Sequence, residues 1–302
     1  MQNHNTRYNI IGAILVFIAA VTVSSKAIMV KLAYAYPVDA STLIALRMAF
    51  STPFFIGLAI WSHASAASKI NRKDAYAIVV LGALGGYGPM LLDFAGLVYV
   101  TAGLERVILY IYPTIVVLMS AFLFKQTITK PVYFALGITY VGVALAVGHD
   151  VLTVKSGAAG TMLGVMLVAA SAIAYAAYLV ASGRLIPRVG ASAFTAYSML
   201  AAAVASGMHY ASKSHQVSIV HLPKSVYVIS LLMAVIATVL PAILLNMGIQ
   251  RIGSSKAALI SSVGPVSTIL LAYGFLGEGV TWLQMVGTGL VLAGVLVISL
   301  KK

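Results

Sequence analysis

Five ionisable residues stand inside long apolar stretches of this sequence: Lys26, Arg47, Asp93, Glu105 and Arg106. Placing such a group in a lipid bilayer costs about 2.5–3.5 kcal/mol on insertion scales, so each one needs a counter-charge, water or a ligand. Lysine and arginine bind carboxylates, and aspartate binds ammonium groups. We therefore take Lys26, Asp93 and Arg106 as candidate substrate-binding residues. The alternative is that the five charges form salt bridges with one another.

Uncharged side chains extend this candidate site. Tyr110 follows the last of the five charges by one helical turn, and Tyr175 and Tyr178 share a helix face. Asn246 and Gln250 are four residues apart and also share a face. Aromatic faces stack on apolar groups and attract cations, and amides donate and accept hydrogen bonds. We add these five residues to the candidate substrate site, although core packing is the competing interpretation for the tyrosines.

The composition indicates which elements must carry these residues. Hydrophobic residues make up 61% of the chain and charged residues 8%, far from the balance of a water-soluble domain. Continuous apolar runs about 20 residues long are typical of transmembrane helices and not of barrel strands. The ten predicted spans lie near residues 9–33, 40–61, 74–98, 102–124, 131–148, 160–182, 192–208, 226–249, 255–275 and 281–300. We therefore expect an all-α membrane protein.

The second half of the sequence repeats the first at a constant shift of 152 residues. Glycines and prolines, which set helix approach and kinks, match best. The matched pairs include Pro89 and Pro241, Pro113 and Pro265, Gly12 and Gly164, and Gly96 and Gly248. Five helices per copy is an odd number, so the second copy must enter the membrane upside down. The sequence thus predicts two inverted five-helix repeats, residues 1–150 and 151–302, as in many secondary transporters.

The charge distribution predicts the orientation. Twelve lysines and arginines fall on the side of the N-terminus and four on the opposite side, which places both termini in the cytoplasm. The net charge of +13 is then a topology signal and an attraction to anionic membrane lipids, and we expect no nucleic-acid partner.

Two prolines at equivalent positions, Pro113 and Pro265, fall in the middle of predicted spans. Because proline removes a backbone hydrogen bond, both helices should be bent or broken there. We expect these bends to act as hinges that gate transport.

The stretches 101–148 and 253–299 each combine a proline-interrupted helix, a short polar turn and a glycine-rich last helix. In this respect the chain resembles the EamA-type carriers of the drug/metabolite transporter superfamily, and Glu278 stands where these families usually place an acid. The first half has Gln126 at the matching position. Among family members the pattern is most similar to bacterial exporters of aromatic or other amino acids. The resemblance implies a secondary carrier of the bacterial inner membrane that works by alternating access.

Three other functions remain open at this point. Relatives in the superfamily export cationic drugs, for which Asp93 would be the main contact, or exchange nucleotide sugars and organophosphates. An integral membrane enzyme is the more distant alternative. The chain has no cysteine and no phosphate-binding loop, so we expect no metal, no cofactor and no ATP hydrolysis. Asp93 or Glu105 could carry a coupled proton, or the carrier could be passive.

Overall fold

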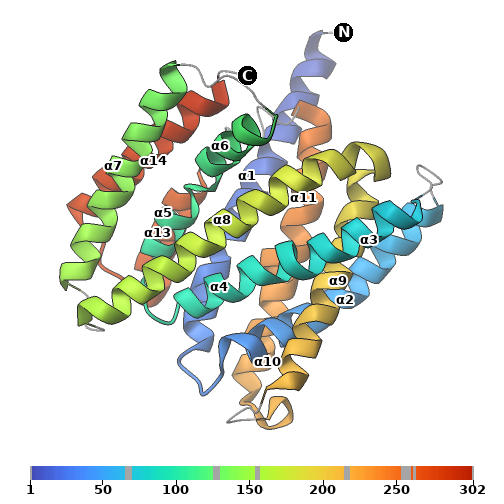
Figure 1. Ribbon diagram of the computed structural model, residues 1–302, viewed down its shortest axis with the longest axis horizontal. Helices are drawn as coiled ribbons and strands as arrows, with labels where there is room; N and C mark the ends of the chain where they lie inside the picture. The colour runs from blue at the N-terminus through green and yellow to red at the C-terminus, as the bar shows by residue number, and fades with distance from the viewer. Residues whose placement is uncertain are drawn as a thin grey trace.

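A computed structural model describes residues 2–64, 70–124, 130–153, 157–213, 218–252, 260 and 263–300. This part of the chain is helical and contains no strand (Figure 1). The helices are α1 (Gln2–Ala33), α2 (Ala40–Ala64), α3 (Arg72–Val80), α4 (Gly88–Gly96), α5 (Ala102–Leu109), α6 (Tyr112–Phe124), α7 (Lys130–Thr153), α8 (Gly157–Val189), α9 (Ala191–Ser212), α10 (Lys224–Ala234), α11 (Leu240–Ile252), α13 (Gly264–Leu276) and α14 (Trp282–Leu300). The all-α prediction is confirmed.

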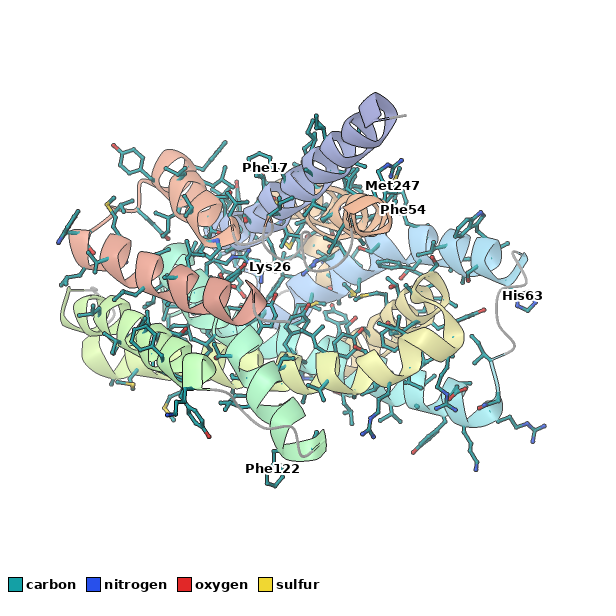
Figure 2. The ribbon with its side chains drawn as sticks, turned by 90° about the horizontal axis from the view of Figure 1, so that it is seen from above. Phe17, Lys26, Phe54, His63, Phe122 and Met247 are labelled. Carbon is teal, nitrogen blue, oxygen red and sulfur yellow. The ribbon has the colours of Figure 1, made fainter. Side chains whose placement is uncertain are left out.

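Six helical spans in the described part are long and apolar enough to cross a bilayer, and two apolar helices are shorter. The six are Ile10–Ala33, Ala40–His63, Arg72–Gly96, Ala159–Ile186, Ala191–Ser212 and Lys224–Leu245, and the two are Gly264–Leu276 and Trp282–Gly294. Large apolar side chains cover the outside: Phe17, Phe54 and Phe122 are 49%, 48% and 86% exposed, and Figure 2 shows Phe122 projecting from the edge of the molecule. Lipid, and not water, solvates such a surface, so the molecule is a membrane protein.

Two of the spans contain a π-helical segment that ends two residues before a proline. Segment η1 (Leu81–Tyr87) joins α3 to α4 ahead of Pro89, and η3 (Val235–Val239) joins α10 to α11 ahead of Pro241. A proline ring collides with the carbonyl group four residues earlier, and proline has no N–H group to donate a hydrogen bond to that carbonyl. The wider π turn accommodates this conflict, so each span stays continuous instead of breaking.

The prolines singled out as hinges stand at helix starts. The span expected at 102–124 is divided into α5 and α6, and Pro113 is the second residue of α6. Pro265 is likewise the second residue of α13. The first turn of a helix has amide groups without intrahelical partners, so a proline fits there without loss. The interruption expected at Pro113 is therefore present between α5 and α6, and at Pro265 the structure describes the start of a helix. A gating role for these two residues stays a prediction.

Close glycine contacts set the helix packing. Gly96 of α4 packs on Gly164 of α8, where a Cβ atom on Gly96 would lie 3.1 Å from the Gly164 carbonyl oxygen. Gly248 of α11 packs on Gly12 of α1, and a Cβ atom on Gly248 would lie 3.0 Å from the Gly12 carbonyl oxygen. Contacts this short leave no room for a side chain, so backbones meet directly, as at other small-residue interfaces in membranes. Helices α7 and α14 form a separate pair at one edge (Figure 1).

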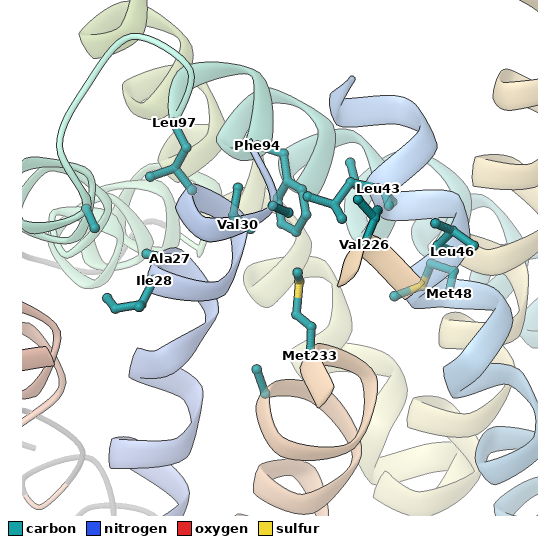
Figure 3. Close-up of a cluster of buried hydrophobic side chains, with 14 of the residues drawn as sticks. Ala27, Ile28, Val30, Leu43, Leu46, Met48, Phe94, Leu97, Val226 and Met233 are labelled. Carbon is teal, nitrogen blue, oxygen red and sulfur yellow. The ribbon is translucent and has the colours of Figure 1, made fainter. Parts of the chain in front are cut away.

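The largest buried hydrophobic cluster joins the end of α1, the beginning of α2, the end of α4 and the length of α10. Figure 3 shows Val30, Leu43, Phe94, Val226 and Met233 converging from these helices. Phe94 and Leu43 are fully buried. This core cluster fills one end of the bundle, and the cavity described next begins where it stops.

Candidate functional site

A cavity of about 440 Å³ lies in the middle of the bundle and is lined by residues from both halves of the sequence. Small-molecule sites commonly have volumes of about 300–1,000 Å³. Lys26, Arg47, Asp93 and Arg106 contribute the charged part of the lining. Figure 2 shows Lys26 in the interior of the molecule.

Lys26 of α1 lies between two carboxylates. Its Nζ atom donates to Asp93 Oδ2 at 2.5 Å and to Glu105 Oε1 at 3.1 Å. The side chain of Lys26 is 13% exposed, that of Asp93 5% and that of Glu105 0%. Two of the candidate residues, Lys26 and Asp93, are thus brought together, with Glu105 as a second acid that the candidate set did not include.

Each of the two acids has one oxygen atom without a hydrogen-bond partner among the described residues, namely Asp93 Oδ1 and Glu105 Oε2. One lysine therefore serves two buried carboxylates, and this triad carries one net negative charge when all three groups are ionised. Buried charges of this kind are costly unless neighbouring groups balance them.

Two arginines near the triad supply positive charge that offsets its net negative charge. Arg47 of α2 donates from Nε to the Thr238 hydroxyl at 2.8 Å, and its guanidinium lies 5.6 Å from the centre of the Phe94 ring. Arg106 of α5 donates from Nε to the Thr268 hydroxyl at 3.0 Å and from Nη2 to the Val23 carbonyl at 3.3 Å. Both guanidinium groups are held by neutral oxygens, so their charge is available to the cavity.

Aromatic rings form the next part of the lining. Tyr110, Tyr112 and Tyr175 follow one another with centroid separations of 6.1 and 5.1 Å and edge-to-face geometry. Tyr178 stacks on Tyr175 at 6.1 Å but belongs to a packed cluster with Phe194 and does not line the cavity. These three tyrosines, Tyr110, Tyr112 and Tyr175, are called the tyrosine ladder below, and they place stacking surfaces beside the charged groups.

The remaining candidates are located only by their backbone. Asn246 and Gln250 lie on α11, and Pro113 on α6, while the side chains of all three fall outside the described residues. Within the described part of the chain, no three His, Asp or Glu residues come together as a metal site would require.

Glu278 holds the helix that carries Glu105 and Arg106. Its carboxylate accepts hydrogen bonds from the backbone amides of Ala102 and Gly103, at 3.1 and 3.3 Å. These amides are the unpaired donors of the first turn of α5, where a negative charge is favourable. The acid in the turn after α13 therefore positions α5 across the bundle. Gln126, its counterpart, lies outside the described residues.

Sequence reasoning missed three residues of the site. Arg47 and Glu105 stand out as charges in apolar spans but are not among the candidate substrate-binding residues, and Tyr112 is absent from the sequence argument. The signal for Arg47 was present, because it lies well inside its span. Tyr112 could not be found from helical spacing, since the chain leaves the helix at Tyr110.

A lipid-solvated helical bundle with a charged, aromatic-lined cavity at its centre is the architecture of a membrane transport protein. The chain belongs to the EamA-like transporter family, whose sequence profile matches residues 10–148 and again residues 162–300. This confirms the family that the sequence motifs indicated.

Individual relatives agree with this assignment. The uncharacterized transporter YcbK of Bacillus subtilis is 30% identical over 281 residues, which cover 92% of this chain and 89% of the relative. The uncharacterized inner membrane transporter YicL of Salmonella typhimurium is 28% identical over 233 residues, covering 77% and 75%. A probable terminal-alkyne amino-acid exporter of Streptantibioticus cattleyicolor is 39% identical over 57 residues, 19% of each chain. A crystal structure with 20% identity matches with a TM-score of 0.65 over 96% of both chains and shares the fold.

Proposed function

We propose that this protein is a secondary carrier of the bacterial inner membrane that exports amino acids, aromatic or of a broad range, and related metabolites by alternating access. The observation that carries the proposal is the central cavity, in which ionised side chains and a tyrosine ladder line one space of about 440 Å³. The charged groups suit the polar end of such a metabolite, and the rings suit its side chain. The short match to an amino-acid exporter supports the same substrate class.

We further propose that residues 1–150 and 151–302 are inverted five-helix repeats that form ten transmembrane helices. Three observations support this arrangement. The family profile matches twice, with starts 152 residues apart. Helices α4 and α11, α6 and α13, and α7 and α14 also begin 152 residues apart. The contact of Gly96 with Gly164 and that of Gly248 with Gly12 are related by the same spacing.

The conformation fits one state of an alternating-access cycle. On α1 the cavity lining reaches Lys26 and the core cluster begins at Ala27, and on α4 the lining reaches Asp93 and the cluster continues at Phe94. The cluster thus closes the end of the cavity beyond the charges. If the N-terminus is cytoplasmic, this closed end faces outward, as it does in both the inward-facing and the occluded states of such a cycle.

The orientation can be tested with single cysteines, because the natural chain contains none. Ser68 and Ser214, both outside the described residues, are predicted to lie on opposite sides of the membrane. A cysteine at position 214 should react with a membrane-impermeant reagent in intact cells, and a cysteine at position 68 should react in inverted membrane vesicles. Labelling of both from the same side contradicts the inverted arrangement.

The transport function is tested by counterflow in proteoliposomes. Vesicles are loaded with an unlabelled amino acid, a lipophilic cation or a nucleotide sugar, and uptake of the matching labelled compound is followed. We expect counterflow with aromatic amino acids and none in protein-free vesicles. Counterflow with only the cation or only the nucleotide sugar refutes the proposed substrate class.

Proton coupling is tested in the same vesicles. The unpartnered oxygens of Asp93 and Glu105 give the buried triad a place to accept a proton, which supports exchange of protons for substrate. A pH-sensitive dye inside the vesicles should then report a proton flux that depends on substrate. Substrate flux without any pH change assigns passive transport instead.

A further inference from the structure

Asp93 and Glu105 lie near enough to the two cavity arginines to attract them, but no described acidic side chain forms an ion-pair contact with either arginine. The chain has 6 acidic residues. Asp39 accepts from Ser41 and Thr42, Asp74 pairs with Arg188, Asp93 and Glu105 pair with Lys26, and Glu278 caps α5. The sixth, Asp150, has a side chain outside the described residues. No described carboxylate is in ion-pair contact with Arg47 or Arg106.

The hydrogen bonds of Arg47 and Arg106 leave donors for a ligand. Arg47 uses only Nε, and neither of its terminal nitrogens has a partner among the described residues. Arg106 uses Nε and Nη2, which leaves Nη1. Both arginines line the cavity, from α2 and α5. A guanidinium fork with unused N–H groups is suited to bind a carboxylate with two parallel hydrogen bonds.

The charge balance of the cavity gives the sign of the missing charge, which is negative whether both acids are ionised or one of them holds a proton. Lys26, Arg47 and Arg106 are cationic, and Asp93 and Glu105 are anionic, so the ionised group carries one net positive charge. Arg47 and Arg106 are only 6% and 7% exposed. Inside a membrane protein an uncompensated charge is expensive, so a ligand with one negative charge would be favoured.

The ammonium group of an amino acid finds no comparable partner. The only carboxylates in the cavity region, among the described residues, are those of Asp93 and Glu105, and Lys26 binds one oxygen of each. Their other oxygens, Asp93 Oδ1 and Glu105 Oε2, are buried, so a substrate ammonium would have to reach these buried atoms beside the Lys26 ammonium or displace Lys26. The site is therefore built around the acid end of its ligand.

We infer that Arg47 and Arg106 form an anion subsite, and that the carrier accepts amphipathic monocarboxylates for which an amino group is dispensable. This inference rests on the proposed carrier function and narrows its substrate class. The carboxylate binds the unused guanidinium N–H groups, while an apolar or aromatic body lies against Tyr110, Tyr112 and Tyr175. Lys26 then balances the two acids instead of binding the substrate.

Three compounds with the same phenyl ring separate the contribution of the carboxylate to binding from that of the amino group. They are phenylalanine, 3-phenylpropanoate, which lacks the amino group, and phenethylamine, which lacks the carboxylate. Each is tested for thermal stabilisation of the purified protein and for competition with the labelled substrate of the counterflow assay. We expect 3-phenylpropanoate to bind within about tenfold of phenylalanine. Loss of two charge-assisted hydrogen bonds should weaken phenethylamine by at least about tenfold.

Variants locate the subsite. Arg47→Gln and Arg106→Gln should each weaken 3-phenylpropanoate by about tenfold or more, and Arg47→Lys, which keeps the charge but not the fork, should weaken it less. Arg251→Gln is the matched control, because Arg251 lies in the last turn of α11, outside the cavity lining. Equal binding by wild type and both glutamine variants overturns the assignment of these arginines. The ligand comparison in the wild type needs no variant and tests the inference even if the variants fail to fold.

The outcomes distinguish this inference from the proposed function. If phenylalanine is transported but 3-phenylpropanoate neither binds nor competes, the amino group is required; the anion subsite is refuted and the amino-acid carrier stands. If phenethylamine binds best, both are refuted, because the cavity then selects cations. If both acids bind and only the deaminated acid is transported, the subsite holds and amino-acid export is refuted.

Discussion

Replacing Lys26 by methionine removes the only cation that the structure places between Asp93 and Glu105. Methionine has nearly the volume of lysine, so the change acts mainly on charge. Two carboxylates then remain buried, with the side chain of Glu105 fully shielded from solvent. Removing one partner of a buried ion pair costs about 3–5 kcal/mol of stability.

A second estimate gives the same magnitude. The stranded acids avoid repulsion if one of them takes up a proton, and at pH 7 this costs about 4 kcal/mol for a carboxyl group that normally titrates near pH 4. The cost falls by about 1.4 kcal/mol for each unit by which the pH is lowered, because protons become more available. The variant should therefore be destabilised at pH 7 and should recover much of the difference by pH 5.

The assay is thermal unfolding of purified protein in detergent at both pH values. A loss of 3–5 kcal/mol corresponds to a decrease of about 6–20 °C in the apparent midpoint at pH 7. Lys26→Met combined with Asp93→Asn should recover part of the loss, because one stranded charge is gone. Lys73→Met, on the exposed start of α3, is the control and should change little. A Lys26→Met protein that melts like the wild type at pH 7 would refute the reasoning.

Three further changes test other parts of the structure. Glu278→Gln keeps the shape but removes the charge at the start of α5, so unfolding measurements should show a loss of about 1 kcal/mol, and an unchanged midpoint contradicts the capping role. Gly248→Ala should destabilise the packing of α11 on α1 by about 1–3 kcal/mol in the same assay. Gly207→Ala, where a Cβ atom meets nothing within 4 Å, should instead be neutral or stabilising, and equal effects at both glycines refute the packing argument. Pro113→Ala and Pro265→Ala should slow transport in proteoliposomes with little change in ligand affinity, and normal turnover with lost affinity refutes a hinge role.

The helices were predictable because each corresponds to a long apolar stretch of the sequence. An apolar run of some 20 residues has few alternative structures, and six of the predicted spans coincide with helical spans long enough to cross a bilayer. The span expected at 102–124 is instead divided into α5 and α6. The ends of the helices were not predictable in this way: the span expected at 131–148 is part of α7, which reaches Thr153, and the one expected at 192–208 is part of α9, which reaches Ser212. Hydropathy measures only the part of a helix inside hydrocarbon, whereas backbone hydrogen bonds continue the helix into the polar interface.

The site was predictable as a set of residues but not as a set of contacts. A charge in an apolar span is rare enough to stand out, and this rule found Lys26 and Asp93. It could not show that Lys26 also reaches Glu105, 79 residues away, because this contact depends on how α5 begins. The carboxylate that fixes this start is Glu278, from the other half of the chain. Distances between distant segments are a property of packing, which spacing along one helix does not contain.

The π-helical segment η1 has a consequence for the evolution of this site. It occupies Leu81–Tyr87, upstream of Asp93 in the same span, and its wide turn sets the angular phase of everything that follows. Deleting one residue there would give a more regular helix but would turn Asp93 by about 100° about the helix axis, away from Lys26. A substitution in η1 acts locally, as at Gly82, where a Cβ atom would overlap the Ser198 carbonyl oxygen. A single-residue insertion or deletion instead turns the whole segment that follows and separates Asp93 from Lys26. Length variation among relatives that keep this ion pair should therefore be confined to their loops.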